Sequence, residues 1–230
     1  MISIRNLDQY YGSSQILWDL SLEIPTGSCT CIMGRNGVGK TTLLKCLMGL
    51  LPVRNGEILI EDRPLQKRPA HERARAGIAY VPQGRDIFPQ LTVEENLRCG
   101  LPCRTDNARE IPGEVFELFP VLRDMLERRG GDLSGGQQQQ LAIARALVID
   151  PRVLILDEPN EGIQPNIVKQ IGDVITYLND NGLTVVLVEQ KLGFARRVGR
   201  EFRLMKKGRI VAADAMANLS DDLIREHLAV

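Results

Sequence analysis

Long apolar runs are missing from this sequence of 230 residues. The longest ones, such as VLIL and VVLV, are far shorter than the roughly 20 apolar residues that a helix needs to cross a bilayer. The start, MISIRNLDQYYGSS, also lacks the basic segment and the apolar run of a secretory signal. We therefore expect a soluble chain in the cytoplasm.

Excess charge is missing as well, because 29 Lys and Arg residues balance 29 Asp and Glu residues. A surplus of positive charge is what attracts a chain to nucleic acid or to an acidic membrane surface. The composition therefore argues against nucleic acid as a partner.

Cysteine and histidine are too few for a disulfide framework or a metal site. The five cysteines are an odd number without a Cys-x-x-Cys pair, and there are two histidines. We expect reduced cysteines that pack as small apolar residues, at Cys29, Cys31, Cys46, Cys99 and Cys103.

What the sequence does contain is a series of short apolar strands. In residues 16–24, Trp18, Leu20, Leu22 and Ile24 alternate with polar residues, which is the period of a half-buried strand. Three later strands are continuously apolar, and this favours central positions in a parallel sheet. The predicted strands are 16–24, 28–33, 56–65, 77–83, 152–159 and 183–190, with a helix over 40–51 and a hairpin around Gly208.

Strand patterns are absent between Gln83 and Asp150. Thr92 and Glu95 form a capping box, which predicts the start of a helix, and residues 112–126 continue in helical or loop character. We expect one domain with an inserted helical lobe. Its predicted parts are an α/β core over 1–86 and 150–216, a helical subdomain over 87–149, and a short tail over 217–230.

The segment GRNGVGKT matches the phosphate-binding pattern G-x-x-x-x-G-K-[ST] between a predicted strand and a predicted helix. Its glycines allow backbone N–H groups to face phosphates, Lys40 adds a positive charge, and the Thr41 hydroxyl can bind Mg²⁺. The predicted nucleotide-binding residues of this loop are Gly34, Asn36, Gly37, Gly39, Lys40, Thr41 and Thr42.

Two acidic residues, Asp157 and Glu158, end the apolar strand VLIL. Asp157 is placed to hold Mg²⁺, and Glu158 to polarise the attacking water. The alternative is an acidic pair that caps a helix. Hydrolysis at a P-loop needs both a carboxylate near the metal and a group that positions water, so we favour the catalytic interpretation.

A second candidate phosphate site lies in LSGGQQQQLAIARAL. Ser134 is a predicted N-cap, and Gly135 and Gly136 leave the amides of an amphipathic helix open to an anion. An ordinary capped helix is the alternative, but it does not need two glycines. A two-fold dimer would use both sites, with the loop of one copy facing the Ser-Gly-Gly of the other. The predicted buried face is Leu141, Ile143, Ala144 and Leu147.

Over essentially its whole length the sequence resembles the ATP-binding subunits of ABC transporters. GRNGVGKTT is similar to their Walker A motif, LSGGQ to their signature motif, and VLILDE to their Walker B motif with the catalytic glutamate. The resemblance implies a P-loop, RecA-like, mostly parallel sheet with an N-terminal antiparallel β portion. It also implies ATP and Mg²⁺ as cofactors, Gln137 at the nucleotide, and Gln83 as a hinge that contacts Mg²⁺ and γ-phosphate.

Three further positions carry the resemblance or depart from it. Tyr11, before Gly12, is in the place of the aromatic residue that stacks on adenine, although a packed tyrosine at a strand end stays an alternative. Gln164 is in the place of the family's D-loop aspartate, and Gln190 is in the place of its switch histidine. The Gln190 amide can donate a hydrogen bond to the γ-phosphate, so we predict a catalytic role for it beside Glu158.

The segments GRDIFPQLTVEENL and DEPNEGIQP resemble importers of branched-chain amino acids and of urea, and EGIQP favours the urea permease. The resemblance implies an ATPase on the inner face of the cell membrane. Its partners would be membrane-spanning permease subunits, a second identical or homologous ATP-binding subunit and, indirectly, a solute-binding protein. We predict urea as the solute. The alternatives are a branched-chain amino acid importer and a soluble ABC ATPase outside transport.

Overall fold

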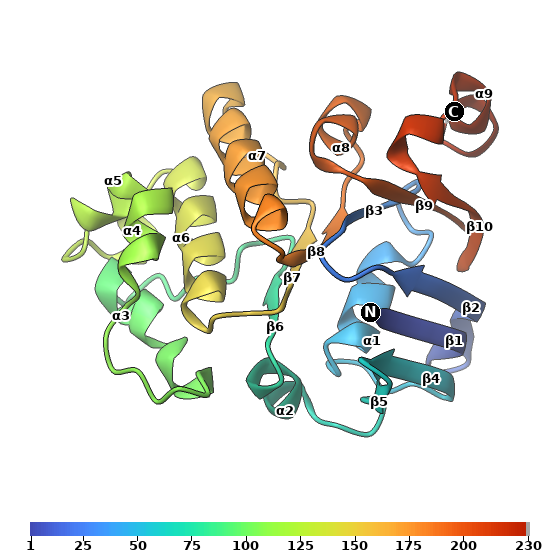
Figure 1. Ribbon diagram of the computed structural model, residues 1–230, viewed down its shortest axis with the longest axis horizontal. Coiled ribbons are helices and arrows are strands. Elements are labelled where there is room, and N and C mark those ends of the chain that lie inside the picture. Colours follow the sequence, from blue (N-terminus) through green and yellow to red (C-terminus); the bar gives the residue numbers. More distant parts are fainter. Residues whose placement is uncertain (229–230) are drawn as a thin grey trace.

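The computed structural model describes residues 1–228, which form two sheets with helices around and between them (Figure 1). The smaller sheet is antiparallel, in the spatial order β2 (Ser14–Ile24), β1 (Ile2–Tyr11), β4 (Asn55–Ile60), β5 (Arg63–Pro64). The larger sheet has the order β10 (Arg209–Ala215), β9 (Glu201–Lys206), β3 (Cys29–Met33), β8 (Thr184–Val188), β7 (Val153–Asp157), β6 (Ile78–Val81). Its strands are parallel except for β10, which forms the predicted hairpin with β9.

Helix α1 (Lys40–Leu47) lies between the two sheets. Its apolar side chains share one core with β1, β2 and β4 and with one face of the large sheet, where Ile155 and Val186 are buried. The opposite face, with Leu154 and Val185, packs against helices α6 (Gly135–Val148), α7 (Pro165–Asp180) and α8 (Leu192–Val198). Both faces of the parallel strands are therefore covered, which explains their continuous apolar sequences.

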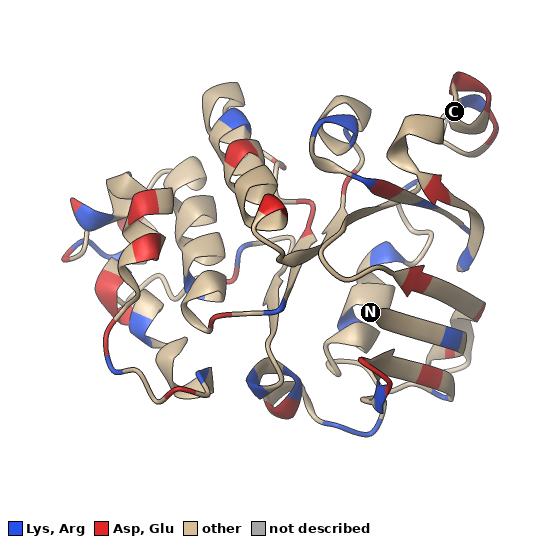
Figure 2. Ribbon diagram, viewed as in Figure 1, with Lys and Arg blue, Asp and Glu red and all other residues tan. Residues whose placement is uncertain are grey.

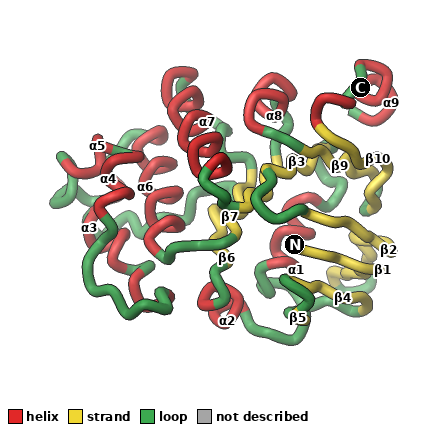
Figure 3. Tube along the Cα trace, in the orientation of Figure 1, coloured by secondary structure: helices red, strands yellow, loops and turns green. Residues whose placement is uncertain are grey.

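Helices make up the segment between β6 and β7 and gather on one side of the molecule (Figure 3). The predicted capping box is confirmed, since the Thr92 hydroxyl accepts from the Glu95 amide and the Glu95 carboxylate accepts from the Thr92 amide. The helices are α3 (Val93–Arg98), η1 (Leu101–Cys103), α4 (Gly113–Leu118), α5 (Pro120–Arg123), η2 (Gly130–Asp132) and α6. Elsewhere are α2 (Ala70–Arg75), η3 (Met216–Asn218) and α9 (Asp221–His227), and residues 229–230 of the predicted tail lie outside the described residues.

The predicted α/β fold class is confirmed, but several details were wrong. In β2 a bulge at Asp19, whose φ is +47°, shifts the alternation, so Leu17 is buried and Trp18 is 43% exposed. Residues 56–65 form two strands, because Glu61 and Asp62 adopt positive φ in a hairpin turn.

The strand β6 was predicted to be central, yet among the described strands it pairs only with β7 and forms an edge of the sheet. It is apolar because helices cover both of its faces, and Pro82, which cannot donate to a further strand, follows it. Helix α6 is buried almost all round rather than amphipathic, with Gln139 and Gln140 inside. Cys99 is exposed, against the expectation of buried cysteines, whereas Cys29, Cys31 and Cys46 are buried.

A buried arginine that the sequence did not reveal supports the helix of the phosphate loop. Arg73 of α2 is 2% exposed, and its guanidinium donates to the carbonyl oxygens of Cys46 and Leu47 at 2.7 Å each. These carbonyls belong to the last turn of α1, where the Cys46 carbonyl also accepts from the Gly49 N–H at 3.1 Å and Arg73 is the donor to the Leu47 carbonyl. Arg73 therefore caps α1 from a neighbouring element.

We predict that Arg73→Met lowers the free energy of unfolding by about 3 kcal/mol, because the Leu47 carbonyl loses its donor and the Cys46 carbonyl loses one of its donors in a buried position. Urea unfolding measures the change. The exposed Arg75, on the same helix, gives the control Arg75→Met, which should change stability by about 0.5 kcal/mol or less. Equal effects of the two substitutions would contradict the capping role.

Candidate nucleotide-binding and catalytic site

The phosphate loop joins the end of β3 to the start of α1, as predicted. A Cβ atom on Gly34 would overlap the carbonyl oxygen of Met205, so only glycine fits there. Gly39 has a φ of +105°, which favours glycine, and it lies against Ile16 and Leu17 of β2. The small sheet therefore fixes the loop from one side and the large sheet from the other.

Lys40 is buried at the end of this loop, with 5% of its surface exposed. Its ammonium donates to the carbonyl oxygens of Gly34 at 2.8 Å and Arg35 at 2.9 Å, and lies 3.8 Å from Oε1 of Glu158. Burial lowers the pKa of Lys40, while Glu158 and Asp157 act in the opposite direction. The Lys40 ammonium is therefore a buried positive charge held in place by the backbone of the phosphate loop.

Asp157 ends β7 and is almost fully buried. The Tyr80 hydroxyl lies 3.5 Å from Oδ2, whereas Oδ1 has no hydrogen-bond partner among the described residues. Burial raises the pKa of Asp157, and Thr41 and Lys40 lower it. A buried carboxylate oxygen without a donor, beside a threonine hydroxyl, is the kind of oxygen ligand that fits Mg²⁺.

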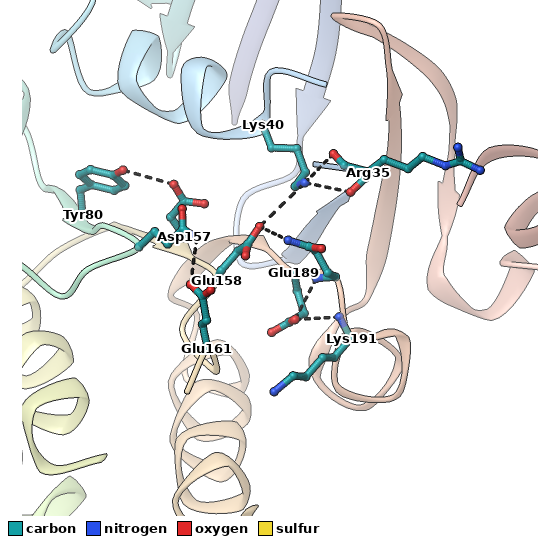
Figure 4. Close-up of polar contacts among 11 residues, drawn as sticks. Arg35, Lys40, Tyr80, Asp157, Glu158, Glu161, Glu189 and Lys191 are labelled. Atoms are coloured by element: carbon teal, nitrogen blue, oxygen red, sulfur yellow. Dashed lines mark hydrogen bonds and ion pairs between the residues drawn. The ribbon is translucent and has the colours of Figure 1, made fainter. Parts of the chain in front are cut away.

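Glu158 follows with a φ of +49°, a strained conformation for a residue other than glycine. Its backbone N–H donates to the carbonyl of Val188 at 2.9 Å, and its Oε1 accepts a 2.6 Å hydrogen bond from Nε2 of Gln190. Figure 4 shows the carboxylate directed toward Lys40, next to Asp157. The structure thus pairs Gln190 with Glu158, a contact that the sequence did not predict.

A second carboxylate, Glu189, orders the loop after β8. It is 3% exposed, its Oε1 accepts from the backbone N–H groups of Gln190 and Lys191 at 2.8 Å each, and its Oε2 accepts from Nδ2 of Asn160 at 2.8 Å. The Lys191 ammonium in turn donates to the carbonyl of Asn160 at 3.1 Å. Sequence reasoning missed Glu189 and Asn160 because neither belongs to a pattern; only their proximity in the fold reveals them.

The other predicted residues lie around this centre. Gln83 is exposed after β6, and its Nε2 donates to Glu161 at 2.9 Å, so it points toward the loop that follows β7. Tyr11 is at the end of β1 and is 47% exposed. It pairs with Ser14 at the start of β2, and Ile16 and Leu17 of the same strand lie against Gly39. The exposure of Tyr11 disfavours the alternative of a packed tyrosine.

The second candidate phosphate site lies apart from the first, at the start of α6, which packs beside α7 on the far face of the large sheet from α1 (Figure 1). Ser134 is the predicted N-cap and forms a capping box, because its hydroxyl accepts from the Gln137 amide and the Gln137 side chain accepts from the Ser134 amide. A groove of ≈ 560 Å³ exposes Ser134, Gly135, Gly136 and Gln137. Gln164, which begins α7 as its N-cap, lies across this groove.

The two glycines also have a packing reason. A Cβ on Gly135 would lie 3.2 Å from the Arg85 guanidinium, and one on Gly136 would lie 3.0 Å from Ile167 of α7. These close approaches favour glycine independently of any ligand. The glycine pair alone therefore does not decide between a phosphate site and a tightly packed helix start.

Together, the phosphate loop, the acidic end of β7 and the capped Ser-Gly-Gly helix define a P-loop ATPase of the ATP-binding cassette type. The family model described as ABC transporter matches residues 17–161. The chain is 41% identical to the high-affinity branched-chain amino acid transport ATP-binding protein BraG of Pseudomonas aeruginosa, over 95% of this chain and 94% of that protein.

It is also 38% identical to the probable branched-chain amino acid transport ATP-binding protein LivF of Archaeoglobus fulgidus, over 95% of this chain and 93% of that protein. Among solved structures, it is similar to a dimeric post-hydrolysis state of the ATP-binding cassette MJ0796 bound to ADP and Pi. That similarity has a TM-score of 0.83 at 26% identity and covers 94% of this chain and 99% of the other. The chain belongs to the ABC transporter family, and it is an ATP-binding cassette that hydrolyses ATP.

Charges of both signs are mixed over the helices and both sheets (Figure 2), as the balanced composition leads one to expect. Within residues 1–228, none of the helices has the length and apolar character required to span a membrane. The same residues contain no cluster of three or more His, Cys, Asp or Glu side chains suited to a metal ion.

We predict that Glu189→Ala lowers the free energy of unfolding by about 3 kcal/mol, because three donors lose their acceptor in a buried position. Glu189→Gln should cost about 1 kcal/mol, since its amide oxygen still accepts from the two backbone N–H groups and Asn160 can turn its unpaired Oδ1 toward the new amide. Thermal unfolding of both variants measures this difference. Equal losses would show that the charge of Glu189, rather than its hydrogen bonds, is required.

Proposed function

We propose that the chain hydrolyses MgATP with the site at the carboxyl ends of β3, β7 and β8. The observation that carries the proposal is the contact of Glu158 with both Lys40 and Gln190. Glu158 would polarise the attacking water, and Gln190 would hold its carboxylate in place. Lys40 and the loop amides would bind the phosphates, with Tyr11 against the adenine.

The Mg²⁺ ion would be held by Thr41 and Asp157, with Gln83 completing the contacts when the nucleotide binds. When bound, this ion neutralises charge on the phosphates. The unpaired Oδ1 of Asp157 supports this assignment. The residues of the chain itself supply the orientation of the phosphates and the activation of water.

We propose that two copies, or this chain and a sister subunit, enclose two nucleotides. The phosphate loop of one would face Ser134, Gly135, Gly136 and Gln137 of the other. The dimeric cassette that this chain resembles supports the arrangement, and so does the distance in the fold between α6 and the chain's own phosphate loop (Figure 1). Each composite site would then need both subunits.

We further propose that residues 1–86 and 150–216 act as a nucleotide-binding core and residues 87–149 as a helical subdomain. A groove of ≈ 740 Å³ between them offers a place for a membrane-spanning permease subunit. It is bordered by α2, η1, α4 and the end of α6, with Arg75, Cys103, Leu118 and Leu147 in its lining. The chain would thereby be held at the inner face of the cell membrane.

For the transported solute we propose a branched-chain amino acid rather than urea. The relatives with 41% and 38% identity are both named for branched-chain amino acid transport. The segment EGIQP, which favoured urea, covers residues 161–165 only. A similarity over 95% of the chain outweighs one of five residues.

We predict that Glu158→Gln lowers the rate of ATP hydrolysis by about 10²-fold or more, because the amide cannot act as a general base. ATP binding should persist, since Lys40 and the phosphate loop are unchanged, and ATP should now stabilise the dimer. Phosphate release and size-exclusion chromatography with ATP measure the two effects. The matched control Glu127→Gln, at an exposed position, should hydrolyse at the wild-type rate; an equally active Glu158→Gln variant would contradict the assignment.

We predict that leucine, isoleucine or valine, and not urea, stimulates ATP hydrolysis by the complete importer. The test uses this chain with its permease subunits and solute-binding protein in lipid vesicles, and measures phosphate release with each solute. Stimulation depends on the solute-loaded binding protein, so its specificity decides the outcome. Stimulation by urea alone would reverse the solute assignment and leave the ATPase assignment intact.

A further inference from the structure

Arg85 connects the loop after β6 with the start of α6 in the same chain. Its Nη1 donates to Oε1 of Gln138 at 3.1 Å, and the guanidinium packs on Gly135, where a Cβ would lie 3.2 Å from Nη1. Nη2 lies 4.0 Å from the Cβ position of Gly162, in the loop after β7. The Arg85 side chain therefore joins the loop after β6 to the Ser-Gly-Gly helix and lies near the loop after β7.

The backbone around Arg85 is held from the same helix. Arg85 and Asp86 have φ values of +69° and +48°, a left-handed pair that needs support from its surroundings. Arg145 of α6 supplies this support, since its guanidinium donates to the carbonyl oxygens of Asp86 at 2.7 Å and Arg85 at 3.4 Å. The same guanidinium lies 5.1 Å from the centre of the Phe88 ring.

The loop is thus bonded to α6 at two places, near the start of the helix through Gln138 and near its end through Arg145. Gln83 is two residues before Arg85, and Ser134 is directly before Gly135. In the proposed dimer, Gln83 faces the nucleotide bound by its own chain, whereas Ser134 faces the nucleotide bound by the partner. A displacement of Gln83 on nucleotide binding would therefore move Ser134 at the other site.

We propose that Arg85 is a positioning residue that couples the two ATP sites of the dimer. This inference rests on the proposed function, because it requires composite sites. Coupling of this kind is reciprocal in binding free energy, so each bound ATP should raise the affinity of the other site. Arg85 acts through Gln138 and Gly135 and need not touch either nucleotide.

The test measures ATP hydrolysis by the full chain against ATP concentration. The wild type should give a Hill coefficient above 1, and Arg85→Met should lower it to about 1 and raise the half-saturating concentration. Gln138→Leu should have the same effect on the Hill coefficient, and the double variant should show no further loss of it, because both substitutions remove the same Arg85–Gln138 hydrogen bond. The matched control, Arg109→Met at an exposed position in the helical segment, should keep the wild-type coefficient.

A structural contact without coupling would lower thermal stability and leave the Hill coefficient at the wild-type value, and that result would overturn the inference. A wild-type Hill coefficient of about 1 would overturn it as well. If Arg85→Met does not fold, Gln138→Leu decides between the same outcomes. Failure of the wild type to hydrolyse ATP or to dimerise would instead refute the proposed function, so the two failures are distinguishable.

Discussion

The carboxyl edge of the parallel strands is the constraint on which the site depends. Asp157 is in register with Val188 of β8, which is paired with Ile32 of β3, so the three strands end at one level. The next residues are tied by the backbone bonds from Glu158 to Val188 and from Glu189 to Ile32. Three segments far apart in the sequence therefore bring the Lys40 ammonium, the carboxylates of Asp157 and Glu158, and the Gln190 amide together at one edge of the sheet.

Sequence patterns predicted the parts of the site that depend on local backbone geometry. A glycine loop between strand and helix, an N-cap and an acidic strand end are each encoded within a few residues, and the fold has them all. The partners of these residues could not be predicted, because Gln190 meets Glu158 and Gln83 meets Glu161 only through tertiary packing. The role of Arg73 could not be predicted for the same reason, because it donates to the carbonyls of Cys46 and Leu47, which are 27 and 26 positions away in the sequence.

Errors in the fold prediction have related causes. The alternation in β2 fails at Trp18 because one left-handed residue, Asp19, inserts a bulge that no periodicity reveals. Apolar strands indicate coverage of both faces rather than a central place in the sheet, so β6 could be apolar and still be an edge. The glycines at 135 and 136 show a similar ambiguity, since a residue chosen for ligand access and one chosen for close packing look alike in a sequence.

The neutral side chain of Gln190 has a physical consequence for the proposed catalytic centre. A glutamine amide donates a hydrogen bond but carries no charge and does not titrate near neutrality, so its ability to donate to Glu158 does not depend on a proton of its own. Gln190 is itself held by Glu189, which accepts from its backbone N–H and from Asn160. The buried carboxylate of Glu189 thus orients Gln190, and the Gln190 amide orients the carboxylate of Glu158, the proposed base. The position of the Glu158 carboxylate is therefore set by a continuous chain of hydrogen bonds from Asn160 through Glu189 and Gln190.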